Sequence, residues 1–267
     1  MGARNSQAPA LQLQNVSCVF GRQKVLWNLD LTIHQGETVV IVGESGCGKS
    51  VTMKVMMKLQ QPTSGRLHWF GQDVDELSAA QLRQQRLRLG YLFQGAALFD
   101  SLSIFENVAF GLRHSGETDE AKIHDTVRDR LTEVGLSADV MPKFPSEISG
   151  GMQKRVGLAR AMALAPDVMF YDEPTTGLDP VNSRRIDDLI LSVRDLHGVT
   201  GVIVTHDLRT VQRVADRIVM LYPRAKLQDH ESQLIFCGTL DELTHNTDPR
   251  VMEYVGDELT TAMRQSA

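Results

Sequence analysis

One stretch of the chain decides its fold, and it reads Val39-Val40-Ile41-Val42-Gly43-Glu44-Ser45-Gly46-Cys47-Gly48-Lys49-Ser50. Thr38 begins a continuous β-branched run that lasts to Val42, which is typical of a strand buried on both faces. The residues after this run match the pattern G-x-x-x-x-G-K-[ST] in full. Residues 49–60 then predict a helix, which Pro62 and Gly65 end. A buried strand, a glycine-rich loop and a helix begin an α/β unit, so we assign the chain to the α/β class.

The glycine-rich loop has the chemistry of a phosphate-binding site. Its glycines let consecutive backbone N–H groups face phosphate oxygens, and the helix start adds partial positive charge. Lys49 would hold the β- and γ-phosphates, and the Ser50 hydroxyl would ligate Mg²⁺. A chance glycine turn would not explain the strand before the loop and the helix after it. The motif predicts nucleotide binding, but it does not distinguish a kinase, a GTPase or an ATPase.

A second strand ends in two acidic residues. Residues 168–171 are apolar or aromatic, and Asp172 and Glu173 follow them. Phosphoryl transfer needs an acid for Mg²⁺ and a group that positions the attacking water, roles that suit Asp172 and Glu173 respectively. Adjacent residues on a strand point in opposite directions, so the two acids can serve different partners. The alternative is a strand that ends in a solvated acidic turn, and the phosphate loop makes this alternative the weaker one.

Composition and net charge limit the classes of function that this chain can have. The chain has 267 residues, of which 42% are hydrophobic and 23% charged, as in a globular protein of one or two domains. Its net charge of −5 argues against non-specific nucleic-acid binding, which needs Lys and Arg to neutralise phosphates. No apolar run approaches the length of a membrane span, and residues 1–10 lack the apolar centre of a signal peptide. The three cysteines show no metal-ligand spacing, which indicates a reducing cytoplasm.

Hydrophobic periodicity gives the organisation of the chain. Short strands are expected within residues 11–42. Further helices are expected at 76–90, 119–135, 151–165 and 183–197, and further strands at 168–171, 199–205, 218–222 and 235–237. In the polar tail, one apolar helical stripe is expected from Val251, Tyr254, Val255 and Leu259. The predicted domains are a core of residues 11–95 and 163–238, a mostly helical insertion of residues 96–162 and a C-terminal extension of residues 239–267.

The remaining motifs indicate a family. They are Phe20 before Gly21, Gln94 after a strand, Ile148-Ser149-Gly150-Gly151-Met152, Thr176-Gly177-Leu178-Asp179, and His206 after the run 202–205. Together with the phosphate loop and the acidic strand, and in this order, they resemble the ATP-binding cassette (ABC) ATPases over residues 11–240. The resemblance implies an α/β P-loop NTPase cassette with a RecA-like core, an antiparallel β subdomain and a helical subdomain insertion.

The resemblance also implies a role for each matching residue. Phe20 would stack on adenine, and phosphate contacts would come from Gly43, Glu44, Ser45, Gly46, Cys47, Gly48, Lys49, Ser50 and Val51. Mg²⁺ would be held by Ser50, Gln94 and Asp172, while Glu173, His206 and Gln94 would act in catalysis. The signature residues Ser149, Gly150 and Gly151 would contact the γ-phosphate of a second cassette, and Asp179 would couple the two sites. The implied ligands are therefore ATP and Mg²⁺.

Each motif has a simpler alternative when it is taken alone. Phe20 would be a core aromatic, Gln94 a solvated loop residue, His206 a strand-end histidine, Ser149 only a helix cap and Cys47 a small loop filler. Two residues depart from the family pattern. Met152 replaces the usual Gln of the signature, and Val51 replaces a second hydroxyl after Ser50. We expect activity to survive the first departure and nucleotide affinity to change modestly with the second.

The resemblance implies partners as well. Family members work as head-to-tail pairs with two ATP molecules at the interface, so this single cassette would form a homodimer or pair with another cassette. A cassette without a membrane segment would dock on a separate permease, at the cytoplasmic face of the inner membrane. Residues 95–108, residues 145–152 and the tail from Asp248 to Tyr254 look most like the Mla-type subgroup, which moves phospholipid. That subgroup works with Mce-domain proteins and a small STAS-domain subunit, and its C-terminal extension helps to hold the dimer and that subunit. The simpler alternative for this tail is a helix that packs on its own core.

Other functions stay open to a test. The cargo rests on resemblance alone, and the alternative transporter is a polar amino-acid importer. A DNA-repair ABC ATPase would carry a long coiled coil between the phosphate loop and the signature, and no heptads are evident here. A translation-associated ABC protein usually has two cassettes in one chain. A P-loop kinase or GTPase would not need the signature or His206, and a non-catalytic module would be expected to lack Lys49, Glu173 or His206.

Overall fold

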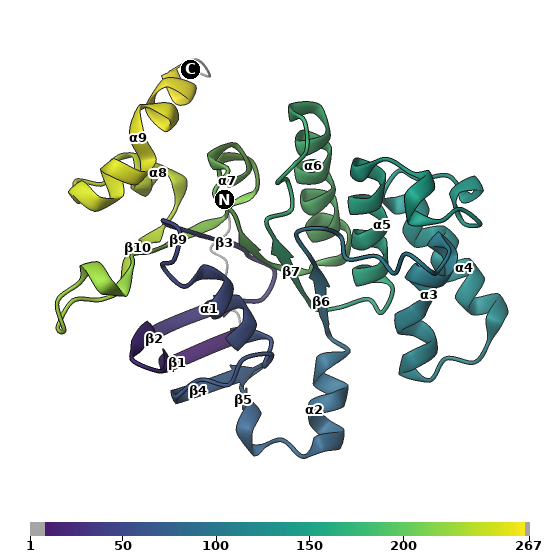
Figure 1. Ribbon diagram of the computed structural model, residues 1–267, viewed down its shortest axis with the longest axis horizontal. Helices are drawn as coiled ribbons and strands as arrows, with labels where there is room; N and C mark the ends of the chain where they lie inside the picture. The colour runs from purple at the N-terminus through teal and green to yellow at the C-terminus, as the bar shows by residue number, and fades with distance from the viewer. Residues whose placement is uncertain (1–8, 265–267) are drawn as a thin grey trace, which may run out of the picture. The chain divides into compact units, whose positions relative to one another are not determined.

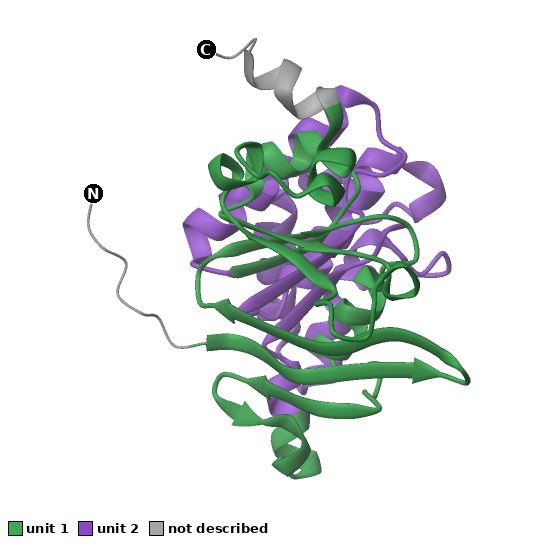
Figure 2. Cartoon of the chain, turned by 90° about the vertical axis from the view of Figure 1, so that its left-hand side faces the viewer, with its two compact units in different colours: residues 1–82, 200–267 green, residues 83–199 purple. Residues whose placement is uncertain are grey.

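A computed structural model describes the backbone of residues 9–264 and the side chains of residues 9–256. The chain divides into two units, residues 1–82 with 200–267 and residues 83–199 (Figure 2). The first, called unit 1, contains the phosphate loop. The second, called unit 2, contains the acidic strand and the signature. The connecting segment holds a 3₁₀ turn, η1 (Val74–Glu76), and the helix α2 (Ala79–Arg86).

Unit 1 begins with an antiparallel sheet in the strand order β2-β1-β4-β5. Its strands are β1 (Pro9–Phe20), β2 (Gln23–His34), β4 (Ser64–Trp69) and β5 (Gln72–Asp73). The expectation of short strands is wrong here, since β1 and β2 are 12 residues each and pair along most of their length. Alternate residues of β2 are buried, namely Leu29, Leu31 and Ile33, so one face of this sheet covers the core.

The second group of strands in unit 1 holds the phosphate loop. β3 (Thr38–Val42) runs parallel to both β8 (Thr200–Val204) and β9 (Arg217–Leu221), and β10 (Leu234–Gly238) pairs antiparallel with β9. Every residue of β3 and β8 is buried, as the sequence predicts for a two-sided strand. The helices of this unit are α1 (Lys49–Met56), α7 (Leu208–Val214), α8 (Leu240–Thr244) and α9 (Pro249–Arg264) (Figure 1).

The helix after the phosphate loop is shorter than predicted. α1 ends at Met56 instead of residue 60, because Lys58 adopts a left-handed conformation with φ of 55°. The Trp69 side chain is fully buried, and its indole N–H donates to the Met56 carbonyl at 2.7 Å. A strand of the antiparallel sheet thus satisfies a carbonyl at the end of α1.

Unit 2 combines two parallel strands with helices. β6 (Leu89–Leu92) pairs in parallel with β7 (Val168–Asp172). The helices α3 (Ile104–Ser115), α4 (Glu120–Glu133) and α5 (Gly150–Met162) pack on one another, and α6 (Pro180–His197) follows β7 (Figure 1). Two 3₁₀ turns, η2 (Ala138–Val140) and η3 (Pro145–Glu147), connect α4 to α5.

The predicted amphipathic helix of residues 119–135 is confirmed as α4, whose Asp119 side chain caps its first turn. Its apolar stripe of Ile123, Val127 and Leu131 is fully buried. The helix predicted over residues 76–90 is wrong at its end. α2 stops at Arg86, and Leu89–Leu92 form β6, because pairing with β7 outweighs the helical propensity of this polar segment.

The predicted helical insertion, residues 96–162, lies inside unit 2 and contains α3, α4 and α5. Its boundaries remain a prediction. In the tail, Val251 and Val255 are buried and Tyr254 is half-buried, but Gly256 interrupts α9 with φ of 55°, so the stripe is not one continuous helix. The side chain of Leu259 lies outside the described residues. Within the described part of the chain, no helix combines the length and the apolar character that crossing a membrane requires.

Candidate functional site

The backbone of the phosphate loop requires glycine at two positions. Gly43 has φ of 139°, and a Cβ there would lie 2.1 Å from the Leu221 carbonyl oxygen. Gly48 has φ of 101°, and a Cβ there would lie 2.6 Å from the Leu26 side chain. The loop therefore packs its backbone directly on β9 and β2, which an L-residue with a side chain would prevent. This close packing fixes the loop at the end of β3.

Lys49 directs its charge into this loop. Its Nζ donates to the carbonyl oxygens of Gly43, at 2.6 Å, and Glu44, at 3.0 Å. Ser50 and Val51 occupy the next positions of α1, whose N-terminus lies at Gly48. An ammonium group and a helix N-terminus at one loop form a site for an anion with several oxygens. Both features fit the triphosphate that the motif predicts.

The other loop residues have distinct surroundings. Cys47 is fully buried, and burial raises the pKa of its thiol in spite of the nearby Lys49 charge, which agrees with its interpretation as a small loop filler. Ser45 and Gly46 are exposed. The Glu44 carboxylate forms an ion pair with the Lys226 Nζ at 2.6 Å.

Two further predicted residues belong to unit 1. Phe20 ends β1 and is 44% exposed, so it is not a core aromatic and its ring face can stack on a ligand. His206 follows β8 and is exposed. The adjacent Thr205 hydroxyl accepts from the Asp207 N–H at 3.0 Å, and this contact supports the turn into α7.

In unit 2, Asp172 and Glu173 lie at the end of β7, as predicted. The Tyr91 hydroxyl donates to Asp172 Oδ2 at 2.8 Å, and burial, together with this carboxylate, raises the pKa of Tyr91 above its usual range. Glu173 has φ of 48°, which is uncommon for a residue with a side chain. Its Oε2 accepts from the Thr176 hydroxyl at 3.0 Å. The two carboxylates thus have different partners.

One lysine of α5 brings two predicted residues together. Lys154 is buried, and its Nζ donates to the carbonyl oxygens of Gln94 and, at 3.3 Å, Glu173. Burial lowers the pKa of this ammonium group. The helix that begins at the signature therefore holds the backbone at both Gln94 and Glu173. Lys154 was not among the residues predicted from the sequence, where its only signal is a lysine on the otherwise buried face of a helix.

A second basic residue of α5 holds the segment after Gln94. Arg160 donates to the carbonyl oxygens of Ala96, at 2.7 Å, and Ala97, at 2.8 Å. Both alanines have positive φ, 60° and 47°. Each such residue costs conformational energy, which the guanidinium contacts offset. Arg160, like Lys154, has no sequence motif that would have predicted its role.

The signature begins α5 on the surface of unit 2. Ser149 caps the helix, because its hydroxyl accepts from the Met152 N–H at 3.3 Å. Gly150 has open space around its Cα. A Cβ on Gly151 would lie 3.3 Å from the side chain of Asn182, which also donates to the Asp179 carboxylate. The exposed start of this helix is suited to an anion.

Asp179 caps α6 in the same way. Its carboxylate accepts from the N–H groups of Asn182 and Val181, both at 3.0 Å. These hydrogen bonds, with that of the Asn182 side chain, hold the pKa of Asp179 below its ordinary value. Through Asn182, unit 2 places the predicted Asp179 beside the signature.

The comparisons with known proteins give the family. The family model described as ABC transporter matches residues 26–176. The chain is 37% identical to the probable ribonucleotide transport ATP-binding protein mkl of Mycobacterium tuberculosis, over 92% of the chain and 66% of that relative, so it spans just under two thirds of it. It is 34% identical to the intermembrane phospholipid transport system ATP-binding protein MlaF of Escherichia coli, over 94% of the chain and 90% of MlaF.

One further relative and one solved structure are also similar to the chain. The methionine import ATP-binding protein MetN 3 of Oceanobacillus iheyensis is 35% identical over 93% of the chain and 72% of its own length. The ATP-binding cassette MJ0796, solved as a dimer in a post-hydrolysis state with ADP and Pi, has a TM-score of 0.74 and 29% identity. This match covers 86% of the chain and 98% of MJ0796. The chain therefore belongs to the ABC transporter family, as one of its ATP-binding cassettes.

Proposed function

We propose that the phosphate loop binds the triphosphate of ATP and that Phe20 stacks on the adenine. The position of Lys49 carries this proposal. Its ammonium donates to two loop carbonyls at 2.6 and 3.0 Å. The loop glycines have no side chains that would cover the backbone around it. Phosphate oxygens are better acceptors than these neutral carbonyls. When ATP binds, the Lys49 ammonium would therefore donate to its phosphate oxygens in place of the two carbonyls.

The residues of the candidate metal site fit Mg²⁺. Ser50, Gln94 and Asp172 offer a hydroxyl, an amide and a carboxylate oxygen, the hard ligands that Mg²⁺ prefers. When bound, Mg²⁺ neutralises charge on the phosphate oxygens. Glu173 would accept a proton from the attacking water, and His206 would hold the γ-phosphate. Lys154 would keep the backbone of Gln94 and Glu173 in place during this reaction.

We propose that two copies of the cassette assemble around ATP. In each copy, the start of α5 would offer N–H groups and the Ser149 hydroxyl to the γ-phosphate bound by the other copy. Asp179, beside Asn182, would couple the two sites. The dimeric relative MJ0796 supports this arrangement. ATP then holds the dimer together, and hydrolysis releases it.

The dimer would power phospholipid movement through a separate membrane permease. The similarity to MlaF over 94% of the chain supports this cargo. The proposed assembly includes an Mce-domain protein and a small STAS-domain subunit, and it would lie at the cytoplasmic face of the inner membrane. The cassette itself does not contact the cargo, so the cargo must be tested on the whole assembly.

The test is purification of the tagged chain from detergent-solubilised membranes of the source cell. We expect mass spectrometry to find a polytopic permease, an Mce-domain protein and bound phospholipid. A Lys49→Ala chain serves as a control, because it should still recover the permease while losing ATP binding. Recovery of a permease with no Mce-domain protein and no phospholipid would contradict the proposed cargo.

Amino-acid import is the second candidate, because the methionine import protein MetN 3 is 35% identical to the chain and MlaF 34%, although the match covers 72% of MetN 3 and 90% of MlaF. The same purification separates the two functions. A permease recovered with a soluble amino-acid-binding protein would favour import. Stimulation of ATP hydrolysis in the purified assembly by that binding protein, and not by phospholipid, would establish it.

A further inference from the structure

The chain leaves the sheet between β9 and β10. We name residues 222–233 the β9–β10 excursion; it contains the 3₁₀ turn η4 (Arg224–Lys226). Its ends are joined, since the Tyr222 N–H donates to the Gln233 carbonyl at 2.9 Å. Nothing in the sequence motifs or in the proposed mechanism uses this segment.

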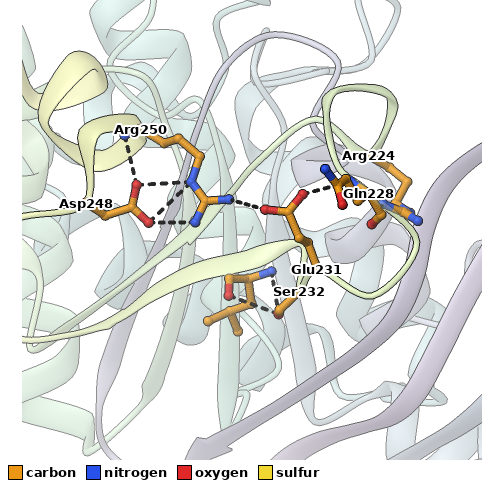
Figure 3. A network of polar contacts seen from close by, with 7 residues as sticks. Arg224, Gln228, Glu231, Ser232, Asp248 and Arg250 are labelled. Carbon is orange, nitrogen blue, oxygen red and sulfur yellow. Dashed lines mark hydrogen bonds and ion pairs between the residues drawn. The ribbon is translucent and has the colours of Figure 1, made fainter.

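Polar contacts give the excursion a defined shape (Figure 3). The buried Arg224 donates to the Gln228 carbonyl at 2.7 Å and to the Asp229 carboxylate at 2.9 Å. From the tail, Arg250 donates to Glu231 at 3.2 Å while it also pairs with Asp248 at 2.6 Å. Contacts within the excursion and a contact from the start of α9 therefore both stabilise its conformation.

Its last residue, Gln233, contacts the phosphate loop. The side chain is only 2% exposed. Its Nε2 donates to the carbonyl oxygens of Cys47 and Val25, each at 2.8 Å, and its Oε1 accepts from the Trp27 N–H at 3.2 Å. Both donors of the amide and its acceptor are therefore used. The reversed amide would face two acceptors with its oxygen, so the contacts also fix its orientation.

The Cys47 carbonyl belongs to the peptide whose N–H is that of Gly48. The peptide is trans, so its C=O and N–H point in opposite directions, and holding the one orients the other. Gln233 also lies close to Gly48, since a Cβ there would be 3.6 Å from Nε2. The contact with Gln233 thus directs the Gly48 N–H away from the excursion.

We propose that Gln233 is a positioning residue of the phosphate loop, which holds the Cys47–Gly48 peptide so that the Gly48 N–H can meet a phosphate oxygen. This proposal rests on the proposed phosphate-binding role of the loop. The ion pair of Lys226 with Glu44 is a second contact of the excursion with the loop, but both side chains are substantially exposed, so its contribution is small. The buried amide is the stronger determinant.

The test compares two matched substitutions. Gln233→Glu keeps the shape of the side chain but turns a carboxylate toward two carbonyl oxygens, while Gln228→Glu makes the same change at an exposed position of the excursion. We expect Gln233→Glu to raise the Kd of a fluorescent ATP analogue about tenfold at pH 8, and the KM for ATP with it. The kcat at saturating ATP should stay near that of the unmodified chain, and Gln228→Glu should change neither constant.

The pH profile separates positioning from a merely structural role. Protonation of the carboxylate introduced by Gln233→Glu restores one donor, so the affinity of this variant should recover in part at pH 6, while the unmodified chain shows no such recovery. If Gln233→Glu does not fold, Gln233→Met takes its place, and the expected tenfold rise in Kd is unchanged. A lower melting temperature with an unaltered Kd would overturn the proposal.

A Lys49→Ala chain tests the phosphate-binding role of the loop separately from the positioning role of Gln233. If Lys49→Ala still binds the analogue normally, the proposed phosphate-binding role of the loop itself is wrong. If Lys49→Ala loses binding and neither Gln233 variant changes the Kd, the loop keeps its role and the inference about Gln233 is wrong.

Discussion

At the residue scale, the phosphate loop depends on backbone atoms that neighbouring side chains hold in place. Lys49 contacts two of its carbonyls and Gln233 contacts a third. In unit 2, Lys154 and Arg160 do the same for the segment that begins at Gln94. In both units, buried or half-buried polar side chains fix the backbone near residues that we place in ATP binding or hydrolysis.

The reactivity of the three cysteine thiols tests whether Cys47 is buried in the phosphate loop. Cys18 and Cys47 are buried, and burial raises the pKa of both thiols, whereas Cys237 is exposed. The thiolate is the reactive form, so raised pKa values lower the reactivity of Cys18 and Cys47 at neutral pH. We expect iodoacetamide at pH 7.5 to alkylate Cys237 alone in the native chain and all three thiols in urea. Peptide mass spectrometry that finds Cys47 alkylated as fast as Cys237 would contradict this burial.

Lys154 gives a kinetic prediction. Lys154→Met keeps an apolar stem on α5 but removes the ammonium that contacts the carbonyls of Gln94 and Glu173. We expect kcat for ATP hydrolysis to fall at least tenfold, on the order of the 2 kcal/mol lost with such a buried charged hydrogen bond, while the Kd for ATP stays within about twofold. Lys122→Met, at an exposed position of α4, is the control. An unchanged kcat in a folded Lys154→Met chain would show that the contact is dispensable.

The residue-scale contacts were only partly predictable. Lys49, Asp172 and Glu173 belong to motifs, because phosphate and metal chemistry restricts which residues can serve at which spacing. Lys154 and Gln233 contact backbone carbonyls, which every residue carries, so no spacing in the sequence points to them. The pair of Gln233 and Val25 is 208 residues apart, and only the fold brings it together.

At the scale of elements, helix N-termini are the shared device. α5 and α6 begin with Ser149 and Asp179, whose side chains accept from the first-turn N–H groups. α3 begins with Ser103, which forms a capping box with Glu106. The caps stabilise each helix, and on α5 the cap residue is also the proposed phosphate contact.

Two serine substitutions separate these roles. Ser149→Ala and Ser103→Ala each remove a cap, so each should lower the free energy of unfolding by about 1 kcal/mol in urea titrations. Only Ser149→Ala should weaken ATP-dependent dimerisation, since Ser103 has no proposed contact with ATP. Sedimentation velocity with ATP measures the difference. Equal dimerisation of the two variants would mean that Ser149 is only a helix cap.

The elements themselves were predictable where burial is strong. β3, β7 and β8 are continuous apolar or β-branched runs, and burial explains their type and their bounds to within a residue or two. A strand was predicted before Gln94, but the first two residues of β6, Leu89 and Gly90, lie in the segment predicted as helix, because they become a strand only through pairing with β7. β4 and β5 were not predicted, since β4 buries only Leu67 and Trp69, an alternation too short to indicate a strand, and β5 has only two residues.

At the scale of the whole molecule, the tail packs on its own unit. Val251 and Val255 of α9 are buried, and Arg250 pairs with Glu231 of the β9–β10 excursion. These contacts fit the simpler expectation, a helix that stabilises its own core. The resemblance adds a second expectation, that the tail also holds partners of the assembly.

Truncation after Leu240 tests that second expectation. We expect the shortened chain to recover less permease from solubilised membranes, since it would lack a docking segment, although Lys49, Glu173 and His206 remain. Arg250→Ala is the milder control, because it breaks the contact with Glu231 while Val251 stays in place. Lower thermal stability with unchanged recovery of the permease would show that the tail stabilises its own unit and does not hold partners.

The central claim is that ATP joins two copies of this cassette and that Glu173 ends the joined state by hydrolysis. Sedimentation velocity of a Glu173→Gln chain in Mg²⁺–ATP tests it most directly, since this substitution keeps the shape of the side chain but removes the base. We predict a stable species of twice 29.7 kDa that forms with ATP and not with ADP, and almost no turnover. A Glu173→Gln chain that stays monomeric with ATP, or hydrolyses it at a near-normal rate, would contradict the claim.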